Sequence, residues 1–203
     1  MKNPAKLVSI EGINFAGKTT QTNLLERTLM KEGHNVCSFK FPDYTTHTGK
    51  LLHRLLYGDG MISVQAIFSL FSTNRLELKP KIEKARTSSR CVLFDRYSET
   101  EYAYGLAKGL PKSWLLALES QMPIADLVFV LNIDPFSALE RAKTMKKRDI
   151  FELDVGLLSK VRQNYLLLAS KPPRARQQWE VVDASKSIER VHDFLETIVL
   201  KIL

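Results

Sequence analysis

The sequence predicts an α/β fold in which a five-stranded parallel sheet lies between two layers of helices. Five short apolar runs alternate with longer stretches of helical periodicity along the 203 residues. Such alternation is typical of parallel sheets that helices cover on both faces. The length suffices for a substantial core, and no repeat, low-complexity tract or linker divides residues 1–203. We therefore expect a single three-layer α/β/α domain.

Strand and helix candidates follow one another in a regular order. The strand candidates are apolar runs bounded by polar or turn-forming residues, and they cover residues 6–10, 35–39, 91–94, 127–132 and 179–182. Helical patterns fill the intervals, and the last carries an apolar stripe at Ile188, Val191, Leu195, Ile198 and Ile202. Pro80 interrupts a long helical stretch over 63–85, so we expect a kink or break there.

A glycine-containing segment follows the first strand candidate and leads into a helical pattern. It fits the spacing G-x-x-x-x-G-K-[ST] of the phosphate-binding P-loop. Gly12 and Gly17 let backbone N–H groups point at phosphate oxygens, and the following helix adds partial positive charge. Lys18 is expected to reach the β- and γ-phosphates, and the Thr19 hydroxyl to bind Mg²⁺. The predicted ATP-binding segment comprises Gly12, Ile13, Asn14, Phe15, Ala16, Gly17, Lys18, Thr19 and Thr20.

In the three-layer fold of a P-loop NTPase, ligands bind beyond the carboxyl ends of the strands. Asp95 follows the strand candidate at 91–94, where it is placed either to hold Mg²⁺ or to cap a helix. Arg96 comes next instead of a second acid that could activate water, which favours phosphoryl transfer to a bound acceptor. Asp183 follows the last strand candidate, where it either contacts the nucleotide base or simply forms a turn.

Net charge, apolar stretches and cysteine content indicate which partners and which cellular compartment to expect. The net charge of +8 suits a nucleic-acid surface, attraction of small polyanions such as nucleotides, or a solvated basic face. No run of Lys and Arg interleaves with aromatic residues, so we expect no nucleic-acid partner. No apolar stretch is long enough for a membrane span, and no secretory h-region is seen. Cys37 and Cys91 form no CxxC motif, so we expect a reducing, cytoplasmic location.

Short motifs in a fixed order connect the chain with a known family. They span nearly its whole length and lie at residues 11–21, 41–42, 48–50, 71–75, 95–98, 123–128 and 182–185. Asp-Arg-Tyr-Ser at 95–98 and Phe-Ser-Thr-Asn-Arg at 71–75 are the most specific. With these motifs the chain resembles thymidylate kinases, which are P-loop nucleoside monophosphate kinases. The resemblance implies phosphorylation of dTMP to dTDP with ATP and Mg²⁺, in dTTP synthesis, by a homodimer packed through helices.

The resemblance also implies the residues of the acceptor site. Phe71 would stack on the thymine ring, and Arg75, one turn along the same helix face, would donate to its O4. Arg96 would bind the acceptor phosphate, and Tyr104 would lie beneath the deoxyribose and exclude a 2′-hydroxyl. Read by themselves, Phe71 also suits the core and Tyr104 a half-buried helix position. The implied acceptor set is Asn14, Phe41, Pro42, Phe71, Arg75, Arg96 and Tyr104.

A charged segment matches the lid of the family. It covers about residues 143–150 and follows the helical stretch 135–142, and a solvated charged loop is the alternative interpretation. Closure of such a lid would bring positive charge onto the transferring phosphoryl group and exclude water. The expected catalytic residues are therefore Lys18, Arg96, Arg141 and Arg148.

Three positions depart from the family pattern. The pair Asn14-Phe15 stands where many members have Asp and Arg within the P-loop, so we expect the catalytic arginine to come from the lid. Tyr44 stands where an arginine often binds the acceptor phosphate, which leaves Lys40 or Arg96 to carry more of that load. Glu101 would repel a monophosphate unless it is paired, and Mg²⁺ or a sugar hydroxyl is its alternative partner.

These departures lie on the acceptor side, so acceptor identity is the open question. The alternatives are a kinase of another deoxynucleotide or a deoxynucleoside, such as dUMP or thymidine. A nucleic-acid-dependent P-loop ATPase is a third hypothesis, suggested by the net charge and opposed by the short single domain. An inactive binding module is opposed by the intact Lys18, Thr19, Asp95 and Arg96. For the expected homodimer, the stretch 62–70 is apolar enough to contribute to an interface.

Overall fold

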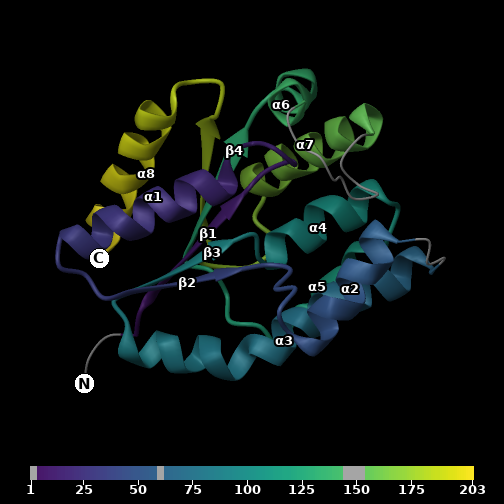
Figure 1. The fold of residues 1–203 in the computed structure, drawn as a ribbon, viewed down its shortest axis with the longest axis horizontal. Coiled ribbons are helices and arrows are strands. Elements are labelled where there is room, and N and C mark those ends of the chain that lie inside the picture. Colours follow the sequence, from purple (N-terminus) through teal and green to yellow (C-terminus); the bar gives the residue numbers. More distant parts are fainter. Residues whose placement is uncertain (1–3, 59–61, 144–153) are drawn as a thin grey trace.

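Five parallel strands form one sheet at the centre of the computed structural model (Figure 1). The structure describes residues 4–58, 62–143 and 154–203. The strand order across the sheet is β2-β3-β1-β4-β5. The strands cover Lys6–Glu11 (β1), Val36–Lys40 (β2), Cys91–Asp95 (β3), Leu127–Asn132 (β4) and Gln178–Asp183 (β5). The predicted α/β/α class and the five strand candidates are confirmed, with each strand end within a residue or two of its expected place.

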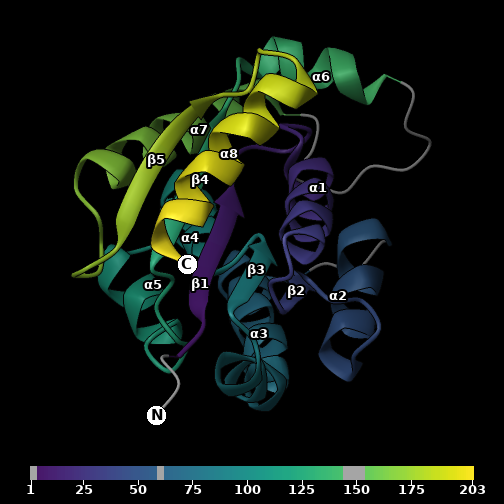
Figure 2. The same cartoon turned by 90° about the vertical axis from the view of Figure 1, so that its left-hand side faces the viewer.

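Helices cover both faces of the sheet. Figure 1 shows α1 beside α8 on one side of the strands, and α4 beside α7 on the other. Figure 2, turned by 90°, shows α2 and α3 packed together near the β2 edge. The described helices are Lys18–Lys31 (α1), His47–Tyr57 (α2), Val64–Ser88 (α3), Ser98–Ala107 (α4), Lys112–Leu118 (α5), Pro135–Ala142 (α6), Val155–Ser170 (α7) and Ile188–Ile202 (α8).

The three central strands carry the core. All five residues of β3 are buried, as are all but one residue in each of β1 and β4. These strands are apolar on both faces because helices pack against both sides of the sheet, which accounts for the continuous apolar runs in the sequence. β5 lies at an edge and is mostly exposed or half-buried.

The helix that contains Pro80, α3, is continuous, so of the expected kink or break the break is excluded. A proline inside a helix removes one backbone hydrogen bond, to the carbonyl four residues earlier. That carbonyl belongs to Leu76, which is 37% exposed, so water can replace the lost donor. Among the described residues, no helix is both long and apolar enough to cross a membrane.

The parallel register brings the carboxyl ends of the strands to one edge. Asp95 at the end of β3 lies opposite Ile10 of β1 and Lys40 of β2. Asn132 at the end of β4 lies opposite Asp183 of β5. The segments that follow these strands therefore meet above the sheet, and they build the site described next.

Candidate active site

The loop between β1 and α1 has a backbone that its glycines permit. Gly12 has a φ of 137°, and a Cβ atom there would lie 2.7 Å from the Leu131 carbonyl oxygen. Gly17 has a φ of 99° and immediately precedes α1, and Phe15 is also left-handed with a φ of 63°. These conformations curl the loop around the N-terminus of α1, where helix N–H groups are available to an anion.

Lys18 is held beneath this loop. Its side chain is buried, and Nζ donates a 2.6 Å hydrogen bond to the carbonyl oxygen of Ile13. Burial lowers the pKa of Lys18 well below its usual range, and the nearby Arg96 guanidinium adds to this effect. A bound phosphate would offset the cost of burying the ammonium, because an opposite charge favours the charged form.

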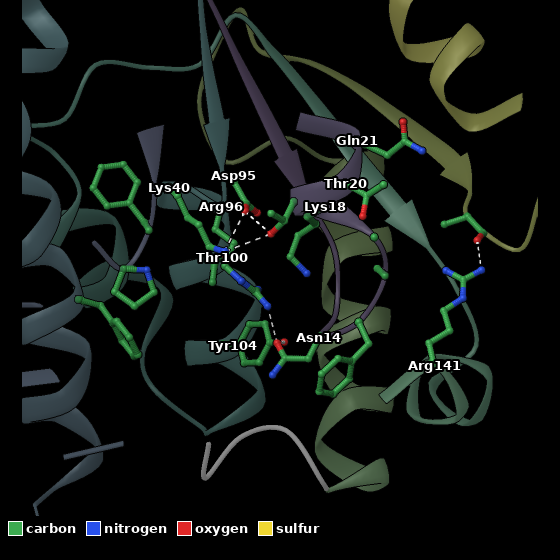
Figure 3. Close-up of a pocket in the computed structure, with 18 of the residues that line it drawn as sticks. Asn14, Lys18, Thr20, Gln21, Lys40, Asp95, Arg96, Thr100, Tyr104 and Arg141 are labelled. Carbon is green, nitrogen blue, oxygen red and sulfur yellow. Dashed lines mark hydrogen bonds and ion pairs between the residues drawn. The ribbon is translucent and has the colours of Figure 1, made fainter. Parts of the chain in front are cut away.

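Thr19 and Asp95 meet at the end of β3. Thr19 Oγ1 donates to Asp95 Oδ2 over 2.5 Å. The exposed Lys40 Nζ lies 3.3 Å from Thr19 Oγ1 and 3.7 Å from Asp95 Oδ2 (Figure 3). A hydroxyl and a carboxylate oxygen are ligands that Mg²⁺ prefers, with phosphate oxygens and water completing its shell. The residues present therefore fit Mg²⁺. The ammonium group of Lys40 already lies beside the same two oxygens.

Arg96, the residue after β3, directs its side chain toward Asn14 of the P-loop. Its backbone is left-handed, with a φ of 67°, and its Nη2 donates to Oδ1 of Asn14. The Tyr104 hydroxyl donates to the same Asn14 oxygen over 2.7 Å, and the Arg96 guanidinium lies 5.7 Å from the Tyr104 ring centroid. Figure 3 shows the three side chains together at one end of the pocket. The structure thus brings together three residues predicted from separate parts of the sequence.

Glu11 supports the site from a buried position before the P-loop, a role that sequence reasoning missed. Its buried carboxylate accepts hydrogen bonds from the Tyr97 backbone N–H (2.7 Å) and from Ser9 Oγ (2.6 Å). It also accepts from Thr100 Oγ1 (2.5 Å) and from the Tyr165 hydroxyl (2.9 Å). Burial raises the pKa of Glu11, and these bonds oppose the rise. Glu11 therefore connects the end of β1 with the backbone next to Arg96. The only sequence signal for this role is its position directly before the P-loop.

Arg75 and Phe71 extend the pocket along α3. Both line it, although Arg75 is only 3% exposed. Arg75 Nε and Nη2 donate to the two oxygens of Glu119 over 3.0 and 2.7 Å, and Nη2 also donates to Glu101 Oε2. Burial alone lowers the pKa of Arg75, but Glu119 and Glu101 outweigh that effect and raise it. The pairing that Glu101 requires is therefore supplied by Arg75.

The two carboxyl groups that bind Arg75, those of Glu101 and Glu119, have pKa values that shift in opposite directions. Burial raises the pKa of Glu101 to about 8, and Arg75 only partly opposes the rise. Burial also acts on Glu119, but Arg75 and two serine hydroxyls outweigh it, so the pKa of Glu119 is lowered. The lowered pKa keeps Glu119 ionised beside the arginine, whereas the raised pKa of Glu101 makes it the more readily protonated of the two.

The loop after β2 is fastened by Asn74, the neighbour of Arg75. Asn74 is completely buried, and its Oδ1 accepts from the Asp43 N–H over 2.8 Å. Its Nδ2 donates to the Asp43 carbonyl oxygen (3.2 Å) and to Thr46 Oγ1 (2.8 Å), which caps α2. The asparagine in the 71–75 motif therefore shapes the loop that presents Pro42 to the pocket.

The opposite end of the pocket is formed by α6 and the loop after β5. Arg141 Nη2 donates to the Ala184 carbonyl oxygen over 2.8 Å, and both residues line the pocket. Figure 3 shows Arg141 on the far side of Lys18 from Arg96 and Tyr104. Asp183 lies outside the pocket lining and accepts hydrogen bonds from Ser185 in a turn. Arg148 and most of the predicted lid lie outside the described residues.

One cavity of about 830 Å³ connects these regions. The predicted residues that line it are Asn14, Phe15, Ala16, Gly17, Lys18, Thr19, Thr20, Phe41, Pro42, Phe71, Arg75, Asp95, Arg96, Tyr104 and Arg141. Gly12, Ile13 and Asp183 are not part of its lining. The lining residues for which the sequence indicated no part in the site are Leu56, Tyr57, Phe68, Lys186, Ser187, Ile188 and Val191. The last four follow the 182–185 motif, so an extension of that motif could have suggested them.

Comparison with known proteins gives a consistent result. A family model described as thymidylate kinase matches residues 10–195. The chain is 34% identical to thymidylate kinase of Schizosaccharomyces pombe over 199 residues, covering 98% of this chain and 93% of the relative. It is also 34% identical to a probable thymidylate kinase of Pyrococcus horikoshii over 198 residues, covering 95% and 94%.

A solved structure agrees with these relatives. Thymidylate kinase from Candida albicans superposes with a TM-score of 0.83 at 29% identity, covering 99% of this chain and 93% of that one. The family model spans the P-loop, Asp95-Arg96 and the loop after β5, which are the segments that meet in the cavity. The chain therefore belongs to the thymidylate kinase family.

Proposed function

We propose that the protein transfers the γ-phosphoryl group of ATP to dTMP, giving ADP and dTDP. One observation carries this proposal: a single cavity is lined by the P-loop and also by the face of α3 that bears Phe71 and Arg75. Asp95 ends the strand beside the P-loop, Arg96 follows it, and both line this shared space. A donor and an acceptor bound there would meet at the segment where charge must be stabilised.

The donor phosphates would be held by the P-loop amides and by Lys18. Thr19 and Asp95 would hold Mg²⁺, which neutralises charge on the phosphates when it is bound. Phosphate oxygens and water would complete the coordination shell of the cation. Arg96, restrained by Asn14, would present its guanidinium to the acceptor phosphate.

The acceptor needs no strong general base. A phosphate monoester has a second pKa of about 6, so its oxygen is already nucleophilic near neutral pH. Among the described residues, the carboxyl groups of Glu11 and Glu101 are buried and engaged with other side chains. Catalysis would then consist of positioning and of electrostatic stabilisation of the transferring group.

Residues 143–150 are proposed as a lid that supplies positive charge within a single catalytic domain. Arg141 supports this assignment because it already lines the cavity at the donor end. Arg148 is proposed to act from the lid, because Phe15 cannot provide the arginine found in the P-loop of many relatives. We also propose that the protein is a cytoplasmic homodimer, with the stretch 62–70, which begins at the exposed Ile62, contributing to the helical interface. Light scattering of the purified protein would measure its mass.

Turnover of a panel of acceptors tests the proposal. Purified protein is mixed with ATP, Mg²⁺ and, in turn, dTMP, dUMP, dCMP, dGMP or thymidine, and ADP release is measured by a coupled assay. We expect the highest kcat/KM with dTMP. A substantially higher value with thymidine would replace the proposal by a deoxynucleoside kinase. ATP hydrolysis stimulated by DNA without dTMP would replace it by a nucleic-acid-dependent ATPase.

A further inference from the structure

Glu101 lies in the wall of the cavity and has one carboxyl oxygen that no described residue binds. The residue is 1% exposed and lines the cavity together with Phe71 and Arg75. Its Oε2 accepts from Arg75, whereas Oε1 has no hydrogen-bond partner among the described residues. Buried polar atoms almost always have a partner, so an unpaired one in the wall of a ligand cavity indicates a place for a ligand group.

Arg75, which binds the other oxygen of Glu101, has one guanidinium nitrogen with no hydrogen bond to a described residue. Its hydrogen bonds to described residues all come from Nε and Nη2, so Nη1 is available. The other carboxylate on Arg75, Glu119, is completely buried and is not part of the cavity lining. Its Oε2 also accepts from Ser98 Oγ over 2.6 Å. Of the two carboxyl groups that hold the arginine, only Glu101 reaches the space where a ligand binds.

The Arg75–Glu101 pair thus offers a hydrogen-bond donor next to an acceptor. The edge of thymine or uracil carries the complementary pattern, a carbonyl at C4 beside an N–H at N3, whereas cytosine carries an amino group beside an unprotonated nitrogen. We propose that Glu101 determines base specificity: its Oε1 accepts the hydrogen bond of N3–H while Arg75 donates to O4. This inference rests on the proposed function and assigns a new role within that site.

The charges around Glu101 are compatible with this role. The charged groups that face it are Arg75 on α3 and Glu119 after α5. Burial raises the pKa of Glu101 to about 8, so in the free protein this carboxyl takes up a proton more readily than an exposed glutamate does. An N–H donor at Oε1 favours the carboxylate, so binding of the base is expected to displace the proton.

The substitution Glu101→Gln provides the direct test. Glutamine can keep its oxygen on the Arg75 guanidinium, because the reverse orientation would set two donors against each other. Its NH₂ group then replaces the free acceptor by a donor, which opposes N3–H of thymine and suits N3 of cytosine. We expect the ratio of kcat/KM for dTMP to that for dCMP to fall at least tenfold.

Glu119→Gln is the matched control, since it makes the same change in the other carboxylate that binds Arg75. It has no contact with the cavity, so we expect kcat/KM for the two nucleotides to change in parallel. A ratio in Glu101→Gln that stays within twofold of the wild-type ratio would overturn the proposal and leave Glu101 a support for Arg75. Circular dichroism of both variants verifies that they are folded.

A measurement on the wild-type protein covers the case in which Glu101→Gln does not fold. dTMP labelled with ¹⁵N at N3 is bound to the protein, and its imino proton is observed by NMR. We expect a downfield signal that is protected from exchange with water. An imino proton that exchanges as rapidly as in free dTMP would overturn the proposal. Failure of the wild-type protein to phosphorylate dTMP would refute the proposed function instead, independently of these two readouts.

Discussion

Replacing Asn74 by alanine should damage dTMP binding and leave ATP binding nearly intact. The side chain makes three hydrogen bonds, two with the backbone of Asp43 and one with the hydroxyl of Thr46. Each such bond contributes about 0.5–1.5 kcal/mol, and the groups left behind belong to Asp43 and Thr46, which are half-buried. The free energy of unfolding should therefore fall by about 2–4 kcal/mol.

The same change should loosen the loop that presents Pro42 and Tyr44 to the acceptor end of the cavity. Because small misplacements of positioning residues are costly, we expect KM for dTMP to rise at least fivefold and KM for ATP to change less than twofold. Urea unfolding followed by circular dichroism gives the stability, and steady-state kinetics with each substrate varied in turn gives the two constants.

Ser72→Ala is the matched control for this experiment. Ser72 is buried on the same helix, and its hydroxyl donates to the Leu118 carbonyl oxygen over 2.9 Å and also lies beside Glu119, away from the loop. Glu119 keeps its bonds to Arg75 and Ser98 in this variant. The substitution should cost about 1 kcal/mol and leave both KM values unchanged. Equal rises of the two KM values in Asn74→Ala, or a stability loss no larger than that of Ser72→Ala, would refute the reasoning.

Three further predictions concern the charged groups. Arg96→Lys keeps the charge but loses the planar fork of donors, so kcat/KM for dTMP should fall roughly 10- to 100-fold in steady-state assays, and an unchanged value would exclude Arg96 from the acceptor site. Affinity for dTMP, measured by calorimetry, should rise about fivefold to tenfold from pH 7 to 8.5, because the pKa of Glu101 is raised to about 8 and the bound base favours the ionised carboxyl group. This rise should be absent in Glu101→Gln, and the same rise in that variant would contradict the assignment. Arg141→Ala or Arg148→Ala should lower kcat at least about tenfold, a loss of about 1.4 kcal/mol, and the lid assignment fails if neither does.

The fold was predictable because its signals are local. The P-loop needs glycine at two positions whose φ values are 137° and 99°, and the sequence displays that requirement directly. The strands are continuous apolar runs because helices bury both faces of the sheet. The break expected at Pro80 was wrong because one missing hydrogen bond does not outweigh the packing of a long helix.

The polar network of the site was less predictable because its partners are distant in the sequence. Glu11 accepts from Tyr165, which lies 154 residues away, and no local pattern announces that contact. Arg75 could be linked with Phe71 by helix spacing, but its partner Glu119 follows another helix, 44 residues further along. Residue type suggested which side chains carry chemistry, whereas the pairing of charges required the three-dimensional arrangement.

Product analysis tests the central claim most directly, namely that the cavity joins a donor and an acceptor for phosphoryl transfer. Wild-type protein is incubated with ATP, Mg²⁺ and dTMP, and the mixture is followed by ³¹P NMR. The account predicts equal amounts of ADP and dTDP, with no inorganic phosphate formed in proportion to the ADP. Formation of ADP and inorganic phosphate without dTDP would contradict it, because the acceptor in the cavity would then be water.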